Sequence, residues 1–157
     1  MTSDEANQLE REFNIIFPAW YRAAVTDHFP FEQPGEEFTN VVEDLRISNQ
    51  GCRKSDPWGF KWQDHFWWIG DDGSGGFYFI DTSESDSTIY SFDHEAPARS
   101  MNDREKLVPQ TFDDFVNEVL SAEEDFARWE IAMRAKVAAR KWWQIWIPRE
   151  WPPRRKH

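Results

Sequence analysis

Pairs of neighbouring carboxylates are the feature of this sequence that could most readily do chemistry. The pairs are Asp71 and Asp72, Asp81 and Glu84, Asp93 and Glu95, and Asp113 and Asp114. Acid–base catalysis requires two carboxyl groups that lie in one cleft and have well-separated pKa values. The chain holds 29 Asp and Glu residues, so pairs this close in sequence are expected by chance. We therefore predict that they are not catalytic and that the protein is not an enzyme.

A glycine-rich segment, GDDGSGG, has a composition shared by phosphate-binding loops and tight turns. A Walker loop ends in Lys followed by Ser or Thr, which this segment lacks, and its two Asp residues would repel phosphate. The ligand spacing of an EF-hand loop is also missing. We predict a hairpin turn, because glycine supplies the positive φ angles that tight turns need. The turn glycines are Gly70, Gly73, Gly75 and Gly76.

The histidine and cysteine content predicts no metal site. His94 lies between Asp93 and Glu95, but no second histidine stands at metal-ligand spacing. Cys52 is the single cysteine and cannot form an intramolecular disulfide, which fits a reducing compartment. Residues 1–12 are acidic and polar, unlike a signal peptide, and no apolar run approaches the roughly 20 residues of a membrane span. We expect a cytoplasmic protein without metal or cofactor.

The elements that must position these residues begin with a predicted antiparallel β-meander. Aromatic and β-branched residues fill Phe66–Ile69, Phe77–Ile80 and Thr88–Phe92, and polar turns separate the three runs. Alternation in the third run places Tyr90 and Phe92 on the same face of the strand.

The N-terminal segments predict two helices. A capping box of Thr2 and Glu5 begins the first helix, because each side chain can accept a backbone N–H of the other residue. Pro18 is expected to be the first residue of a second helix that ends near Asp27.

One more strand and two irregular segments are predicted around the meander. Val41–Ile47 is rich in β-branched residues and predicts a strand that joins the sheet, followed by a polar loop at Asn49–Gly59. Phe60 and Trp62 begin an alternating run that leads into the meander. Ala96–Gln110 is polar and contains two prolines, so it predicts an irregular crossover.

A long amphipathic helix is predicted after Thr111, which can form a capping box with Asp114. Its apolar residues recur at intervals of three and four: Phe112, Phe115, Val119, Ala122, Phe126, Trp129 and Met133. Packing across the sheet is our first explanation of this stripe, and a coiled coil is the second. Ser121 and Glu124 predict a restart of the helix as a second segment.

Charge divides the chain into two parts. Residues 128–157 hold nine Lys or Arg and two Glu, a formal charge of +7, whereas residues 1–127 hold nine cations and 27 acids, a formal charge of −18. Phosphate binding depends on Lys and Arg, so the acidic part is not expected to bind nucleic acid directly. We predict one domain over 1–127, followed by a basic, Trp-rich helical extension and tail over 128–157.

The tail, KWWQIWIPREWPPRRKH, places Trp142, Trp143, Trp146 and Trp151 among cations and prolines. Three interpretations fit it. The tryptophans complete the core of the acidic domain, which is our first choice, or they form an interaction arm, since Trp and Arg are favoured interface anchors. The third interpretation is a segment that lies on an anionic membrane surface.

Several segments in this order resemble a known family. They are WWIGDDGSGGFYFID (Trp67–Asp81), IYSFDHE (Ile89–Glu95) and TFDDFVNEVL (Thr111–Leu120), after an N-terminal helix, a Phe-Pro break and an aromatic helix. The arrangement resembles the SMI1/KNR4 family of the SUKH superfamily, over roughly Leu9–Leu120. The family's Leu-Pro-x-x-Tyr motif stands here as Phe17–Tyr21 (FPAWY), and PFEQPG replaces the usual Asn-Gly.

The resemblance implies an α+β domain with a central, mostly antiparallel sheet flanked by N- and C-terminal helices, and no catalysis. Bacterial members are immunity proteins that bind and neutralise a cognate polymorphic toxin, frequently a nuclease or a deaminase. Fungal members are regulatory binding proteins in cell-wall signalling. We therefore expect an immunity protein first, and a cytoplasmic regulatory scaffold that uses its Trp-rich tail second. A small hydrolase that uses a carboxylate pair is the third alternative.

The acidic body would speed association with a basic toxin domain through electrostatic steering. The residues predicted to contact the toxin are the acids around the turns of the meander: Asp71, Asp72, Glu84, Asp86, Asp93 and Glu95.

Overall fold

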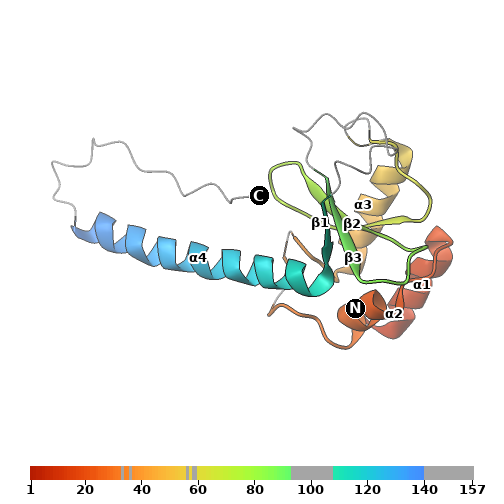
Figure 1. Cartoon of the computed structure of the whole chain (residues 1–157), viewed down its shortest axis with the longest axis horizontal. Coiled ribbons are helices and arrows are strands. Elements are labelled where there is room, and N and C mark those ends of the chain that lie inside the picture. The colour runs from red at the N-terminus through yellow and green to blue at the C-terminus, as the bar shows by residue number, and fades with distance from the viewer. Residues whose placement is uncertain (33, 36, 56, 58–59, 93–107, 140–157) are drawn as a thin grey trace. The chain divides into compact units, whose positions relative to one another are not determined.

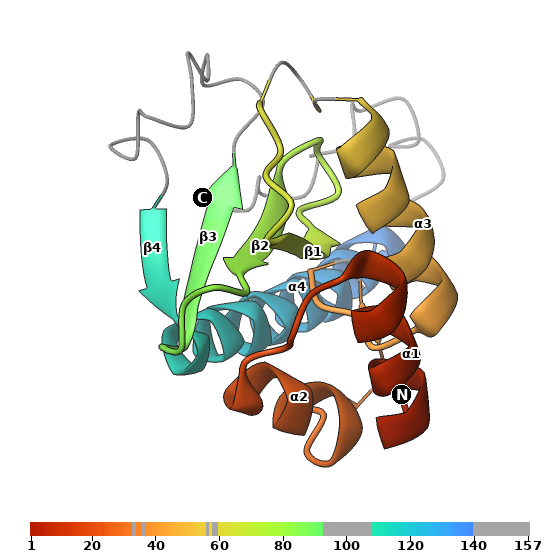
Figure 2. The ribbon, with the colours of Figure 1, turned by 90° about the vertical axis from the view of Figure 1, so that its right-hand side faces the viewer.

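The computed structural model describes residues 1–32, 34–35, 37–55, 57, 60–92 and 108–139. Within these residues the chain is α+β, with four helices and one antiparallel sheet (Figure 1). The strand order is β1–β2–β3–β4 (Figure 2). The helices are α1 (Ser3–Phe13), α2 (Ala19–Thr26), α3 (Val42–Lys54) and α4 (Phe112–Ala139). The strands are β1 (Phe66–Asp71), β2 (Phe77–Asp81), β3 (Thr88–Phe92) and β4 (Val108–Thr111). The mixed fold class and the antiparallel sheet are confirmed.

The chain divides into two compact units, Met1–Phe115 and Val116–His157. The first turn of α4 therefore belongs to the first unit, and the rest of that helix belongs to the second. The predicted domain boundary between residues 127 and 128 falls inside α4, which continues through it.

The predicted meander is confirmed. β1 pairs with β2, and β2 pairs with β3, both antiparallel. Tyr90 faces Phe79 and Phe92 faces Phe77, so Tyr90 and Phe92 share a face as the alternation predicts. β4 pairs antiparallel with β3 at the far edge of the sheet (Figure 2). The predicted irregular crossover is therefore wrong for residues 108–110, and the rest of it, residues 96–107, lies outside the described residues. The prediction took the proline in this segment as a sign of irregular structure. An edge strand tolerates proline, however, because the missing N–H is not needed for pairing on its open side.

Helices α1 and α2 and the start of α4 contribute aromatic side chains to a core against one face of the sheet. Trp67 is fully buried at its centre, with ring centroids 5.1 Å from Phe13 and 5.0 Å from Phe17. Its Nε1–H donates to the hydroxyl of Tyr21 at 2.9 Å. Phe115 of α4 lies against Tyr78 on the same side, with ring centroids 5.0 Å apart. Aromatic contacts of this kind dominate the energetics of a core.

The opposite face of the sheet is covered by the segment that precedes β1. Phe60 is buried, with its ring 4.9 Å from Phe92 and 5.6 Å from Phe79. Trp62 is also buried and lies 5.7 Å from Phe77. The predicted alternating run is not a strand, because residues 60–63 form no ladder, yet both of its aromatic side chains face the core.

The first two predicted helices are confirmed. The Thr2–Glu5 capping box is present, with Glu5 N donating to Thr2 Oγ1 and Thr2 N donating to Glu5 Oε2. Pro18 is the N-cap of α2 and not its first residue, so the helix begins one residue later than predicted. It ends at Thr26, one residue before the predicted end.

The predicted strand at Val41–Ile47 is wrong, because this segment begins α3. Leu45 and Asn49 are fully buried four residues apart, a helical spacing, whereas Val41 and Ile47 are 39% and 60% exposed. The β-branched content suggested a strand, but the buried positions follow the period of a helix. The polar loop predicted from Asn49 therefore begins six residues too early, because α3 continues through Lys54.

Helix α4 is also more regular than predicted. It runs without interruption from Phe112 to Ala139, so Ser121 does not restart a second helix. Its predicted start is confirmed, because Asp114 N donates to Thr111 Oγ1 at 3.1 Å.

Candidate functional site

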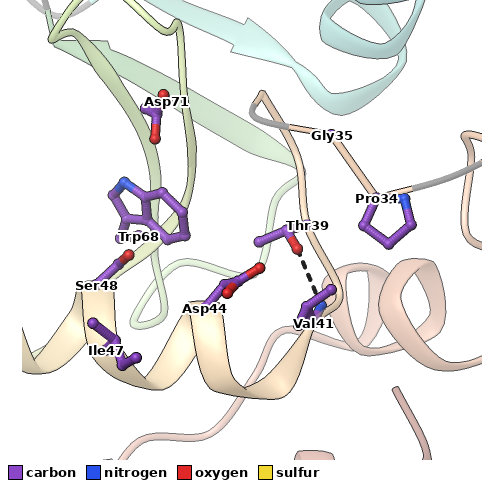
Figure 3. Close-up of a pocket in the computed structure, with 9 residues that line it drawn as sticks. All are labelled: Pro34, Gly35, Thr39, Val41, Asp44, Ile47, Ser48, Trp68 and Asp71. Carbon is purple, nitrogen blue, oxygen red and sulfur yellow. Dashed lines mark hydrogen bonds between the residues drawn. The ribbon is translucent and has the colours of Figure 1, made fainter.

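A groove of about 500 Å³ lies between the first half of α3, the outer edge of β1 and the loop that precedes α3 (Figure 3). We call it the α3–β1 groove. Its lining combines apolar side chains, hydroxyls and two carboxylates. The lining residues are Pro34, Gly35, Thr39, Val41, Asp44, Ile47, Ser48, Trp68 and Asp71.

A bulge in β1 places Trp68 and Asp71 on the same side of the sheet. Trp68 faces Phe79 and Asp71 faces Phe77, and those two β2 residues share a face because they are two apart. In a regular strand, residues three apart would point to opposite faces. The register shift between Trp68 and Gly70 adds the one residue that reverses this. Figure 3 shows the Asp71 carboxylate near the indole of Trp68. The bulge therefore brings both side chains into the groove.

Asn49 holds α3 against the outer edge of β1. Its side chain accepts from Trp68 N at 2.8 Å and donates to Trp68 O at 3.1 Å, as a neighbouring strand would. It also donates to Leu45 O at 2.8 Å and is fully buried. The edge of a sheet leaves backbone groups unpaired, and burying them without partners costs free energy. The amide of Asn49 supplies those partners, so α3 can form a wall of the groove.

Thr39 fixes the loop that forms the opposite wall. Its N–H donates to the carbonyl of Ile69, the extra residue of the bulge, at 3.1 Å. Its Oγ1 accepts from Val41 N at 3.1 Å, where α3 begins without a side-chain cap of its own. The bulge, the loop and the start of α3 are thus linked by hydrogen bonds.

The two carboxylates give the groove its chemical character. Asp44 lies in the first turn of α3, where the helix dipole stabilises a negative charge. Asp71 accepts from Gly73 N at 2.9 Å. Among the residues that the structure describes, neither forms an ion pair. Two negative charges beside exposed Val41 and Ile47 suit a ligand that carries both a cation and an apolar surface.

The predicted contact residues do not gather in one place. Asp71 lines the groove, and the neighbouring Asp72 builds the β1–β2 turn by accepting from Ser74 N and Gly76 N. Glu84 and Asp86 lie in the β2–β3 turn, at the other end of the strands, where Glu84 accepts from the hydroxyl of Tyr90.

The other predicted site residues lie outside the described residues. They are Asp93 and Glu95 among the acids, and Trp142, Trp143, Trp146 and Trp151 in the tail.

The predicted hairpin turn is confirmed, and its glycines have distinct roles. Gly73 and Gly75 have φ angles of 68° and 109°, which other residues rarely adopt. A Cβ at Gly76 would lie 2.8 Å from the carbonyl oxygen of Phe92 and 2.5 Å from a carboxylate oxygen of Asp72. Gly70 does not lie in the turn as predicted, because it is a residue of β1 that pairs with Tyr78 next to the bulge.

Replacing Gly76 with alanine is expected to lower the free energy of unfolding by about 1–3 kcal/mol, because the new methyl group overlaps backbone that cannot move freely. Urea unfolding measures the change. Gly51→Ala is the matched control: a Cβ there meets nothing within 4 Å, and alanine should stabilise α3 by about 0.5–1 kcal/mol. Equal effects at both positions would contradict the close approach at Gly76.

A second cluster of reactive side chain types surrounds Asp81 at the other end of β2. His65 Nε2 lies 3.6 Å from Asp81 Oδ2, and the Ser83 hydroxyl donates to Asp81 Oδ1. In a hydrolase the imidazole accepts the serine proton, and the carboxylate orients the imidazole. Here the serine bonds to the carboxylate instead, and Ser83 N donates to the same oxygen. The cluster closes a turn and is not arranged for nucleophilic catalysis.

Cys52 and the acids offer little further chemistry. Burial raises the pKa of the Cys52 thiol to about 11, so it is protonated and weakly nucleophilic at neutral pH. Across the described ranges, no three His, Cys, Asp or Glu side chains are placed to hold a metal ion. No helix in that part of the chain is long and apolar enough to cross a membrane.

Sequence reasoning missed the groove because two local errors hid it. The first error was to predict a strand in place of α3, which gave no reason to expect Asp44 and Ile47 beside β1. The second was to assume regular alternation along β1, which would put Trp68 and Asp71 on opposite faces of the sheet. One signal was present in the sequence: Asn49 follows Leu45 by four residues, as expected of a buried polar position on a helix.

Comparison of the chain with protein-family models, curated proteins and solved structures finds no match. The resemblance to the SMI1/KNR4 family therefore stays a prediction.

Proposed function

We propose that the protein is a non-enzymatic protein-binding domain, similar to the SMI1/KNR4 family, that recognises a basic partner through the α3–β1 groove. The observation that carries this proposal is the lining of the groove. Asp44 and Asp71 supply negative charge without ion-pair partners in the described part of the chain, and Val41 and Ile47 expose apolar surface beside them. A protein surface with a Lys or Arg next to an apolar residue satisfies both features.

The physiological role we propose is immunity: binding and neutralising a cognate toxin of the nuclease or deaminase type in the cytoplasm. The formal charge of −18 over residues 1–127 supports this role, because toxins that act on nucleic acids need a basic surface. Complementary charge speeds the encounter and disfavours acidic partners. An inhibitor that must capture a toxin quickly benefits from both effects.

The test is co-expression with the toxin domain encoded by the neighbouring reading frame, with growth and calorimetric binding as readouts. The variant Asp44→Lys/Asp71→Lys should lose protection and raise the Kd about 10- to 100-fold, since a lost charge-assisted contact corresponds to roughly 1.5–3 kcal/mol. The control is Glu84→Lys/Asp86→Lys, which makes the same charge change at the other end of the strands. Circular dichroism confirms that both variants fold.

Three outcomes would contradict parts of the proposal. Equal loss in both variants would show that the groove is not the specific site, because overall charge or contacts at Glu84 and Asp86 would then contribute as much to binding. The lack of a neighbouring toxin would remove the immunity role. Loss of binding after removal of residues 136–157 would favour the second candidate, a regulatory scaffold that binds through its tail.

A further inference from the structure

The part of α4 in the second unit carries a regular stripe of apolar side chains, of which Phe126 is exposed and Ala122, Trp129 and Met133 are partly exposed. Phe126 is 48% exposed, and its ring lies 5.6 Å from that of Trp129, one turn further along the same face. With Ala122 and Met133 these residues are spaced by four, three and four positions, the repeat of the a and d positions of a coiled coil. We call these four residues the α4 seam. An apolar surface of this kind marks an interaction site.

The charges beside the α4 seam disfavour a second copy of the chain as its partner. In this heptad register Glu123 and Glu130 occupy e positions, and Glu118 and Asp125 occupy g positions. A parallel dimer would place Asp125 opposite Glu130 of the other copy, and an antiparallel dimer would pair e with e and g with g. Both arrangements bring like charges together, which destabilises the pair.

The cations of α4 only partly neutralise these acids. Arg128 lies 3.0 Å from Asp125, and Arg134 lies 2.7 Å from Glu130. Exposed pairs between residues three or four apart contribute little and are screened by salt, so the cations of a partner can compete with them. Within the described helix, Glu118 and Glu123 form no ion pair.

We propose that the α4 seam binds a cationic amphipathic helix of a partner protein, with apolar residues at its a and d positions and Lys or Arg at e and g. Apolar packing against Phe126 and Trp129 supplies affinity, and the acidic flanks select the charge of the partner. This surface is separate from the α3–β1 groove, and the inference does not depend on the proposed immunity role.

The probe is a synthetic three-heptad peptide with Leu at a and d and Lys at e and g, and its counterpart with Glu at e and g is the matched control. Fluorescence anisotropy with the full chain should show binding of the Lys peptide alone. Glu123→Lys/Asp125→Lys/Glu130→Lys should weaken Lys-peptide binding by about tenfold or more and create binding of the Glu peptide, because several e/g pairs change sign.

Two single substitutions separate the α4 seam from general hydrophobic adhesion. Phe126→Ala should weaken binding of the Lys peptide about tenfold, as expected for an interface anchor. Ile131→Ala should not, although Ile131 is 69% exposed, because it lies on the opposite side of the helix. Circular dichroism verifies that both variants keep their helicity.

Four results would overturn the proposal. They are equal binding of the two peptides, equal effects of the two alanine substitutions, dimerisation of the full chain through α4, and Lys-peptide binding that begins only when residues 140–157 are removed. The last result would assign the α4 seam to the chain's own basic tail.

Discussion

Replacing Asn49 with alanine is expected to lower the free energy of unfolding by about 3–4 kcal/mol. The side chain of Asn49 makes three hydrogen bonds from a fully buried position. Alanine removes them and leaves the N–H and carbonyl of Trp68 buried at the edge of β1, where each unsatisfied group costs about 1–3 kcal/mol. Urea unfolding of the purified chain, followed by circular dichroism, measures the loss.

The control for this prediction is Gln50→Ala, one residue further along α3. Gln50 donates to Glu12 at 3.1 Å on the surface, so its loss should change stability by less than about 0.5 kcal/mol. Asn49→Leu fills a similar volume without the amide, and it should be about as destabilising as alanine. Wild-type stability of the leucine variant would show that the edge of β1 does not need the amide.

Asn49→Ala should also affect the groove. The same side chain that closes the edge of β1 aligns α3, which carries Asp44 and Ile47. Partner binding should therefore weaken in this variant even at temperatures where it remains folded, whereas Gln50→Ala should leave binding unchanged.

The sheet was the part of the fold most open to prediction from sequence. Its first three strands are rich in β-branched and aromatic residues. The turn between β1 and β2 needs glycine at positions 73 and 75, because both residues have positive φ angles. These signals are local, and so they are visible in a short window of sequence. The capping box at Thr2 and the start of α4 after Thr111 were predictable for the same reason.

The errors arose where distant contacts decide the structure. α3 carries β-branched residues, yet it is a helix because Leu45 and Asn49 must face β1 together. β4 contains a proline and few apolar residues, and it is a strand because β3 offers it an unpaired edge. The groove depends on both α3 and the bulge in β1, so no single segment of the sequence predicts it.

Replacing Trp67 with alanine is expected to have the largest effect on stability, a loss of about 4–5 kcal/mol. The indole is fully buried between Phe13 and Phe17, and it donates a hydrogen bond to Tyr21. Its removal leaves a large cavity and an unpaired hydroxyl at the centre of the core. Thermal unfolding should show a strongly lowered Tm or no cooperative transition. Trp129→Ala, on α4, is the matched control and should lower the free energy of unfolding by less than about 1 kcal/mol.

The burial of the Tyr21 hydroxyl, which accepts the hydrogen bond from Trp67, can be tested separately through pH. Burial raises the pKa of Tyr21 above its ordinary value near 10. Above that pH the unfolded chain loses the phenolic proton while the folded chain keeps it, so the contribution of this group to stability is complete below pH 10 and is lost as pH rises. The expected slope is about −1.4 kcal/mol per pH unit. Tyr21→Phe should lower the free energy of unfolding by about 1–3 kcal/mol at pH 7, because it leaves the indole N–H of Trp67 without a hydrogen-bond acceptor. The free energy of unfolding of this variant should also fall less steeply above pH 10 than that of the wild type. Parallel curves of stability against pH for the two proteins would show that Tyr21 is not the buried group that titrates.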